Sequence, residues 1–420
     1  MTKLILLNFT AIACFLIIVS CASPKKPDMY QVGVSVANIT PKAGAFIAGD
    51  ANNRQFTGVH DSLFAKVVVL SDAKNSIALL TFDCIGMLYP TLLKIREAVA
   101  QQVPLATFDP NHIVMASTHT HAGPDVVGIW GPNQMTSGVD TLYMNDVVSK
   151  AAHAVIAALK NRQPATAGFA VSTFGSDWVY NISDSLSIDR SLTTIQFKGT
   201  DGKSIASITN FACHPTILDK ATSLVSADYV QGMYAHLDDK LGGVNLFLQG
   251  AIGGWVQPEY EKKEFAAAEK RGIELGSKVA SILQNSQPVI GVSIGFKRRT
   301  LNLPVSNPGF KQLSGLGIIN RSFTDSVATE VAWFSIGNAQ FVTHPGETTP
   351  VHSLQTKALM KNSGPKFVIG LGMDALGYIL SPNFFNPNKP LQHTEYMLSM
   401  SVDKEAGTVL MKNITAMSKQ

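Results

Sequence analysis

Apolar and polar residues alternate along this chain in two patterns, one typical of strands and one typical of helices. Residues 64–72 and 76–84 are two apolar runs joined by a turn, as expected of neighbouring strands. Residues 141–163 carry apolar side chains at helical spacing, which predicts a long amphipathic helix. The other predicted strands lie at 32–40, 112–118, 165–174, 193–215 (a hairpin), 244–254 (running into a glycine-rich loop), 292–305, 330–347 and 367–373. The other predicted helices lie at 90–103, 227–243, 264–284 and 349–362.

This order of elements predicts an α/β fold with a mixed β-sheet core flanked by helices. The sequence has neither an internal repeat nor a low-complexity linker, so we predict a single domain over residues 32–420. In open α/β sheets, ligands bind beyond the strand ends. The residues at the ends of the predicted strands are therefore the candidates for chemistry, and we expect a metal site there.

The N-terminal residues predict export and lipidation. Residues 1–20 are mostly apolar with one charge, and their length and position are typical of a secretory signal. "IVSC" at 18–21 resembles a bacterial lipobox, which makes Cys21 the predicted lipidation site. Residues 21–31 then form an acylated cysteine and a polar tether, and we expect a lipoprotein held to a membrane of the bacterial cell envelope. A plain signal peptide with an incidental cysteine is the alternative.

Charge and cysteine content narrow the class of protein. The formal net charge is +4 without a basic block, so nucleic acid is not an expected partner. Beyond Cys21 only Cys84 and Cys213 remain, each within an apolar stretch. We predict two buried, unpaired thiols, with a single disulfide between them as the alternative.

Residues with metal-binding chemistry follow several predicted strands. "ASTHTHAGPD" places His119 and His121 at the end of a buried strand. If strand geometry persists through both, their rings point to the same side. His214, Glu347 and Tyr378 follow later strands or stand at their ends. These positions predict that distant parts of the sequence contribute to one site.

Two imidazoles and a carboxylate are a common protein contribution to catalytic zinc, which keeps a position open for water. The same set also suits non-haem iron(II). His-x-His alone is a weak signal, because most histidines at strand ends are surface or hydrogen-bonded residues. That interpretation applies to His60, His112, His153, His236 and His393. The chain lacks His-Glu-x-x-His, Gly-x-Ser-x-Gly and Walker-type motifs.

Four motifs follow one another along the chain: "ASTHTHAGPD" at 116–125, "NFACHPT" at 210–216, "FVTHPGETT" at 341–349 and "GLGMDALGYILSP" at 370–382. In this order they resemble the motifs of the neutral/alkaline non-lysosomal ceramidases, specifically their N-terminal catalytic domain. That family has His-Thr-His-Ser-Gly-Pro, Phe-Ala-Val-His-Pro-Thr, a Pro-Gly-Glu segment and a Gly-Leu-Ser-Asn segment leading to Gly-Tyr. The resemblance extends over nearly all of residues 32–420.

The resemblance implies a zinc-dependent amidohydrolase in which a metal-bound water attacks the amide of an N-acyl lipid or a smaller amide. The zinc ligands that it implies are His119, His214, Glu347 and Tyr378. It places His121 beside the scissile carbonyl, as a donor to the developing oxyanion. Three acids beside the matched motifs are candidates for orienting the histidines or, alternatively, for capping nearby backbone: Asp83, Asp125 and Asp228.

Two departures from the family pattern concern groups that face the substrate. Where the family has Gly-Asp-Val-Ser-Pro, this chain has "GAIGGWVQP", so Gln257 replaces the serine and Gly254 the aspartate. Where an Asn-Arg pair is expected, the chain has Asn181 and Ile182. A hydroxyl and a cation are thereby lost while the implied metal ligands remain, which weakens the case for ceramide itself. A lipoprotein that binds a lipid or amide without hydrolysing it is the alternative function.

Overall fold

The computed structural model describes residues 29–259 and 262–420. The predicted signal peptide, Cys21 and most of the tether lie outside the described residues. None of the described helices is long and apolar enough to cross a membrane.

The larger of two main sheets has nine strands, eight of them in the order β11-β9-β8-β6-β1-β3-β4-β5, with β13 added to β6. The pairs β4–β5 and β9–β11 are parallel and the other pairs are antiparallel, so the sheet is mixed as predicted. Its strands are β1 (Tyr30–Asn38), β3 (Phe64–Ser71), β4 (Ser76–Phe82), β5 (Ile113–Ser117), β6 (Gln163–Thr173), β8 (Ser191–Gly199), β9 (Ser204–Phe211), β11 (Val244–Gln249) and β13 (Gln287–Pro288).

This nine-stranded sheet is rolled. The strands at the two ends of its order, β5 and β11, contact each other although no ladder pairs them. Strand twist accumulates across a sheet, so a long order of strands curls until its ends approach. The roll brings the C-terminal ends of β5, β9 and β11 to one place, and the candidate site lies there.

The second sheet has four strands in the order β14-β15-β16-β18. It packs against the first sheet, and Asn210 of β9 joins the two by donating to the carbonyl of Val368 at 3.1 Å and accepting from its N–H at 3.2 Å. The alternating pattern predicted these strands, but not that they form a sheet of their own. They are β14 (Ile294–Pro304), β15 (Ser326–Ile336), β16 (Ala339–Thr343) and β18 (Lys366–Ile369).

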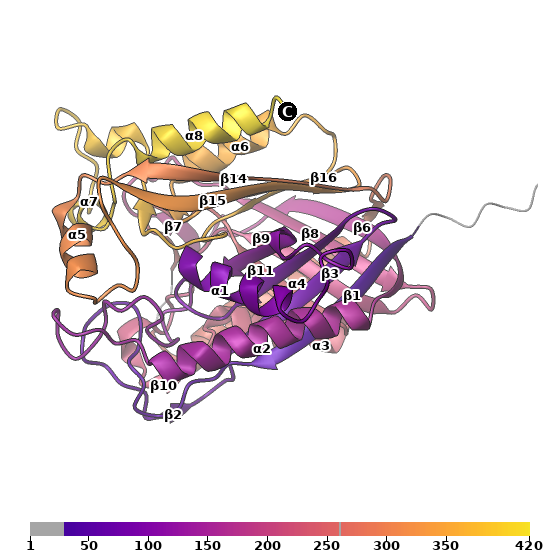
Figure 1. The fold of residues 1–420 in the computed structure, drawn as a ribbon, viewed down its shortest axis with the longest axis horizontal. Coiled ribbons are helices and arrows are strands. Elements are labelled where there is room, and N and C mark those ends of the chain that lie inside the picture. Colours follow the sequence, from indigo (N-terminus) through magenta and orange to yellow (C-terminus); the bar gives the residue numbers. More distant parts are fainter. Residues whose placement is uncertain (1–28, 260–261) are drawn as a thin grey trace, which may run out of the picture.

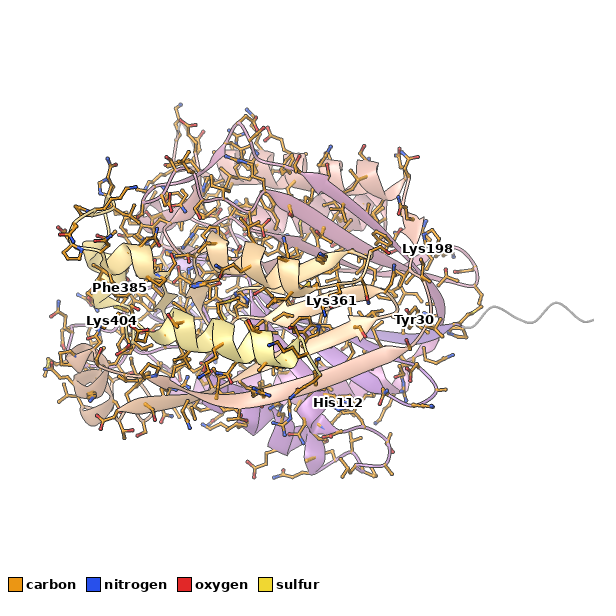
Figure 2. The ribbon with its side chains drawn as sticks, turned by 90° about the horizontal axis from the view of Figure 1, so that it is seen from above. Tyr30, His112, Lys198, Lys361, Phe385 and Lys404 are labelled. Carbon is orange, nitrogen blue, oxygen red and sulfur yellow. The ribbon has the colours of Figure 1, made fainter. Side chains whose placement is uncertain are left out.

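Helices cover the outer faces of both sheets (Figure 1). Helix α2 begins at an N-cap, Asp140, whose carboxylate accepts from the N–H groups of Leu142 and Tyr143. Figure 2 shows α6 and α8 together over the second sheet, with Lys361 and Lys404 near their ends. The first sheet is covered by α2 (Thr141–Lys160), α3 (Tyr229–Lys240) and α4 (Phe265–Leu283), with α1 (Tyr89–Ala100) packed on α2; the second sheet is covered by α6 (Pro350–Leu359) and α8 (Ala406–Met417).

Two short helices, α5 (Pro308–Gly315) and α7 (Glu395–Ser399), were not predicted, and neither was α8. Within the described residues, short strands form three two-stranded sheets, one of which pairs β2 (Gly58–Val59) with β10 (Leu224–Val225) and another β7 (Val179–Asn181) with β12 (Val256–Pro258). The predicted helices and strands are otherwise present. Cys84 and Cys213 are both buried and unpaired, which confirms that prediction.

Candidate metal centre

Five of the candidate residues lie around one cavity at the rolled end of the first sheet. His119 and His121 follow β5, and His214 follows β9. Glu347 begins β17 (Glu347–Thr348) and Tyr378 begins β19 (Tyr378–Ile379). These two short strands pair in parallel with Glu347 opposite Tyr378, so one pairing delivers both side chains.

The geometry of the cluster is close. Ring nitrogens of His119, His121 and His214 all lie within 4.8 Å of one another. The carboxylate of Glu347 lies between two of the rings, with Oε1 3.6 Å from Nε2 of His119 and Oε2 3.1 Å from Nε2 of His214. Tyr378 donates its hydroxyl hydrogen to Glu347.

Main-chain carbonyls orient two of the rings. Nδ1 of His119 donates to the carbonyl of Ile85 at 2.5 Å, and Nδ1 of His214 donates to the carbonyl of Val256 at 2.8 Å. Because a carbonyl can only accept, each Nδ1 carries a hydrogen. In a neutral ring held this way, Nε2 presents its lone pair to the shared space.

The protonation states agree with this arrangement. Burial lowers the pKa of His119 to about 3, so the ring is neutral at physiological pH. Burial alone would raise the pKa of Glu347, but the site holds it below its usual value, in part because the Tyr378 hydroxyl donates to the carboxylate. The lone pair of neutral His119 and the carboxylate thus face the same space, and a cation placed there would satisfy both. The donor set of imidazole nitrogen, carboxylate and phenol oxygen suits zinc.

His119 departs from the geometry expected of it. Strand β5 ends at Ser117, and His119 has φ of +72°. The rings of His119 and His121 do face the same cavity, but strand alternation does not explain it. The reason given for the prediction was therefore wrong. The turn itself aims the ring of His119, in a backbone region that costs energy for a residue other than glycine.

The three candidate acids do not orient the rings. Asp83 accepts from the N–H of Phe64. Asp125 accepts from main-chain N–H groups of the loop that follows it, among them Gly128. Asp228 caps α3 at Tyr229 and accepts from Leu218. Carboxylates near strand and helix ends serve backbone donors first, so the alternative of capping describes all three.

His121 is held differently from the other two histidines. Its Nδ1 is buried without a partner among the described residues. A Cβ placed on Gly49, whose φ is +85°, would stand 2.5 Å from that nitrogen. The loop before the site therefore needs glycine at this position so that it can pass directly over the ring.

Sequence reasoning missed several residues of the site. Trp255 donates from Nε1 to the Tyr378 hydroxyl at 2.7 Å, and its φ of +59° is a strained conformation for tryptophan. The carbonyls of Ile85 and Val256 carry no sequence signature at all. The Gln249 amide reaches the chain before both His119 and His214, and only its place at the end of an apolar strand marks it.

The cavity has a volume of about 500 Å³. Its acidic lining residues are Asp50, Asp219 and Glu347, and no lysine or arginine is among the described residues that line it. Ile182 and Gln257, the two departures from the family pattern, both face it. An apolar part of the wall belongs mainly to the second core cluster and comprises Leu88, Val127, Ile129, Phe310, Ile319 and Phe323.

A model of the family described as neutral/alkaline non-lysosomal ceramidase, N-terminal, matches residues 30–245, just over half of the chain. The chain belongs to this family. The matched segment contains His119, His121 and His214, whereas Glu347 and Tyr378 lie beyond it.

Proteins similar to this chain are named neutral ceramidases. The neutral ceramidase of Pseudomonas aeruginosa is 24% identical over 272 residues, which cover 58% of this chain and 40% of that protein. Neutral ceramidase A of Dictyostelium discoideum is 22% identical over 245 residues, or 52% of this chain and 34% of that protein. The matched part of the chain thus spans well under half the length of these relatives.

Solved ceramidase structures share the fold. The crystal structure of the Pseudomonas aeruginosa neutral ceramidase superposes with a TM-score of 0.78 at 16% identity, covering 93% of this chain and 74% of that one. A structure described as ceramidase complexed with C2 gives a TM-score of 0.77 at 16% identity, with coverage of 93% and 75%. The α/β fold with a mixed, helix-flanked sheet is therefore that of the neutral ceramidases.

Proposed function

We propose that this protein is a zinc-dependent amidohydrolase that cleaves the amide of an N-acyl lipid or a related amide. The observation that carries the proposal is the convergence of His119, His214, Glu347 and Tyr378 on one cavity. The Glu347 carboxylate lies 3.6 Å from Nε2 of His119 and 3.1 Å from Nε2 of His214. Family membership supports amide hydrolysis, and the names of the relatives support a ceramide-like substrate.

The residues present would hold Zn²⁺ through Nε2 of His119 and His214, the carboxylate of Glu347 and the hydroxyl of Tyr378. When bound, the ion supplies a Lewis acid that polarises a carbonyl and lowers the pKa of water towards about 7. The neutral state of His119 means that this ring need not lose a proton before it binds the ion.

His121 is the proposed donor to the oxyanion that develops on the amide carbonyl. Its Nε2 lies 3.4 Å from Nε2 of His119, which carries a lone pair because its Nδ1 donates to Ile85. Nε2 of His121 is therefore the nitrogen that carries hydrogen on this side of the ring. A donor fixed before the reaction stabilises developing charge without reorganisation.

The substrate class follows from the lining of the cavity. The apolar wall suits an acyl chain, because burying each methylene is favourable by about 0.8 kcal/mol. The described lining offers carboxylates but no lysine or arginine to an anionic group. We therefore propose a neutral amide rather than an N-acyl amino acid. The proposed lipid anchor at Cys21 would hold the enzyme at a membrane of the cell envelope, where such substrates are found.

Elemental analysis and a hydrolysis assay test the proposal together. Purified protein should contain about one zinc per chain, by the donor count of a single mononuclear site, and should release fatty acid from N-acyl amides. His119→Ala should abolish both, while His153→Ala, an exposed histidine of α2, should change neither. Protein without stoichiometric zinc, together with a His119→Ala variant that hydrolyses amides normally, would refute the proposal.

A further inference from the structure

Gln249, the last residue of β11, is fully buried between the two segments that carry the ligand histidines. Its Nε2 donates to the carbonyl of Thr118 at 3.1 Å and to the carbonyl of Cys213 at 2.8 Å. Its Oε1 accepts from the N–H groups of Cys213 and Gly250, both at 3.1 Å. All four hydrogen-bonding positions of the amide are therefore used, and a flipped amide would lose every one of them.

These contacts reach the residues immediately before His119 and His214. β5, which leads to His119, and β11, which runs beside the strand leading to His214, are the opposite ends of the strand order and share no ladder. Among the hydrogen bonds of the described residues, those of the Gln249 amide are the ones that reach the main chain before both histidines. The Gln249 side chain thus supplies hydrogen bonds where β5 and β11 meet without a ladder.

The main chain of Gln249 contacts a third segment of the site. Its carbonyl accepts from the N–H of Gly370 at 2.9 Å. A Cβ on Gly370 would stand 2.0 Å from the carbonyl oxygen of Gly250, so the two segments cross in close contact. Gly370 begins the stretch that leads to Tyr378. One residue therefore lies against the segments of three proposed ligands.

We propose that Gln249 is a positioning residue of the metal centre, whose amide sets the separation between His119 and His214. The carbonyls of Ile85 and Val256 fix how each ring is turned, but each acts on one ring alone. The distance between the rings depends on how the two segments lie relative to each other. The Gln249 amide connects them immediately before the two histidines, and after the histidines a longer main-chain bond joins the N–H of His121 to the carbonyl of Pro215 at 3.4 Å. This inference rests on the proposed metal site.

Two substitutions remove the connection in different ways. Gln249→Met keeps the length of the side chain and removes all four hydrogen bonds. Gln249→Glu keeps its shape but turns a donor into an acceptor that faces two carbonyl oxygens. Asn245→Leu is the matched control, because Asn245 is also a fully buried amide of β11 but bonds to Asp238 and Ser207, away from the ligand segments.

The readout is metal binding by folded protein rather than catalysis. Kd values for Zn²⁺ and Co²⁺ come from competition with a chromophoric chelator, and the Co²⁺ absorption spectrum reports the coordination geometry. Urea unfolding of metal-free protein reports stability separately. We expect both Gln249 variants to bind metal about 10–100-fold more weakly, with a changed Co²⁺ spectrum. Asn245→Leu should lose stability and keep the wild-type Kd and spectrum.

Folded Gln249 variants with wild-type affinity and spectrum would overturn the inference and leave the proposed function standing. If neither Gln249 variant folds while Asn245→Leu does, Gln249 is a structural residue and the inference is also overturned. If wild-type protein binds no metal, the proposed function fails instead. The imidazole ¹⁵N shifts of His119 and His214 in metal-free protein then decide: unchanged shifts in Gln249→Met count against positioning, and changed shifts support it.

Discussion

The two halves of the proposed metal centre are built on different supports. His119 and His214 follow strands of the nine-stranded sheet, and main-chain carbonyls hold their rings. Glu347 and Tyr378 sit on a parallel pair of two-residue strands. A main-chain carbonyl remains in place when its side chain is substituted, so it can still accept from the histidine ring. A pair of strands as short as β17 and β19 needs support from its surroundings. The second half is therefore the one that substitutions at a distance should disturb.

That support includes a buried ion pair beside Tyr378. Asp374 is fully buried and binds Arg321 at 2.6 Å. Its carboxylate also accepts from the N–H of Tyr89 at 2.9 Å and the hydroxyl of Thr329 at 2.5 Å. The loop from β18 to β19 is thus fastened to α1 and β15 by a single carboxylate. The comparison between the halves can be tested by breaking each support in turn.

Asp374→Ala should produce the largest effect. It leaves the buried guanidinium of Arg321 without its carboxylate, which costs about 3–5 kcal/mol of unfolding free energy. Urea titration measures this loss, and zinc affinity should fall with it. Asp325→Ala breaks the exposed Asp325–Lys311 pair and should leave the urea midpoint unchanged. Equal effects of the two substitutions would contradict the role given to Asp374; Asp374→Asn provides a milder variant for the same comparison.

In the histidine half, the corresponding test introduces a steric clash. Gly49→Ala adds a Cβ 2.5 Å from Nδ1 of His121, and the ring must move. A displacement of about 1 Å near reacting groups costs roughly 100-fold in kcat. Gly44→Ala is the matched control, because Gly44 has a similar φ of +88° but nothing within 4 Å of an added Cβ. Both variants should lose stability, and only Gly49→Ala should lose kcat; equal kcat values would show that the ring tolerates the contact.

Tyr378→Phe tests the short strand pair directly. It removes the hydroxyl that accepts from Trp255 and donates to Glu347. Zinc affinity should fall about 10–100-fold, because an unsupported carboxylate loses its orientation. Chelator competition measures it. Tyr30→Phe removes a comparable hydroxyl bond, 2.8 Å long, to the carbonyl of Gly291, away from the cavity, and should leave zinc affinity unchanged. A Tyr378→Phe protein with wild-type affinity would argue against this phenol as a ligand.

His344 gives the smallest expected effect, through pH. Burial, together with nearby His352, lowers the pKa of His344 from 6.5 to about 3. As pH falls through this range the unfolded chain binds a proton that the native chain does not, so stability falls by about 1.4 kcal/mol per pH unit. His344→Gln should remove this part of the slope in urea titrations from about pH 7 to about pH 5. Above about pH 6.5 the two curves should run parallel, and equal slopes below it would contradict the assignment.

The residues proposed as ligands could be located in the sequence because each follows an apolar strand within a recognisable motif. His119, His214, Glu347 and Tyr378 do meet around one cavity. The groups that orient them were not predictable, since a main-chain carbonyl such as that of Ile85 looks the same at every position of a sequence. Carboxylates are visible in a sequence, but their roles are not: Asp228, for which both orienting and capping were open, serves as a helix cap.

The fold, like the site, has features that the sequence reveals and features that it does not. Apolar runs and alternating polarity located the strands of both sheets apart from β13, because a strand has one or both faces buried. The pattern could not assign β14–β16 and β18 to a separate sheet, since the partner of a strand is not encoded in its own period. Nor could it reveal that β5 and β11 come together, because that contact depends on twist summed over a whole sheet.

The meeting of β5 and β11 also bears on the order of folding. The site needs contacts between segments that lie far apart in the sequence, such as the contact of Thr118 with Gln249, which are 131 positions apart. Contacts of such long sequence separation form late, because loop closure must precede them. Metal uptake during refolding should therefore coincide with the final step of folding. A bound ion would then stabilise the completed fold rather than direct its formation.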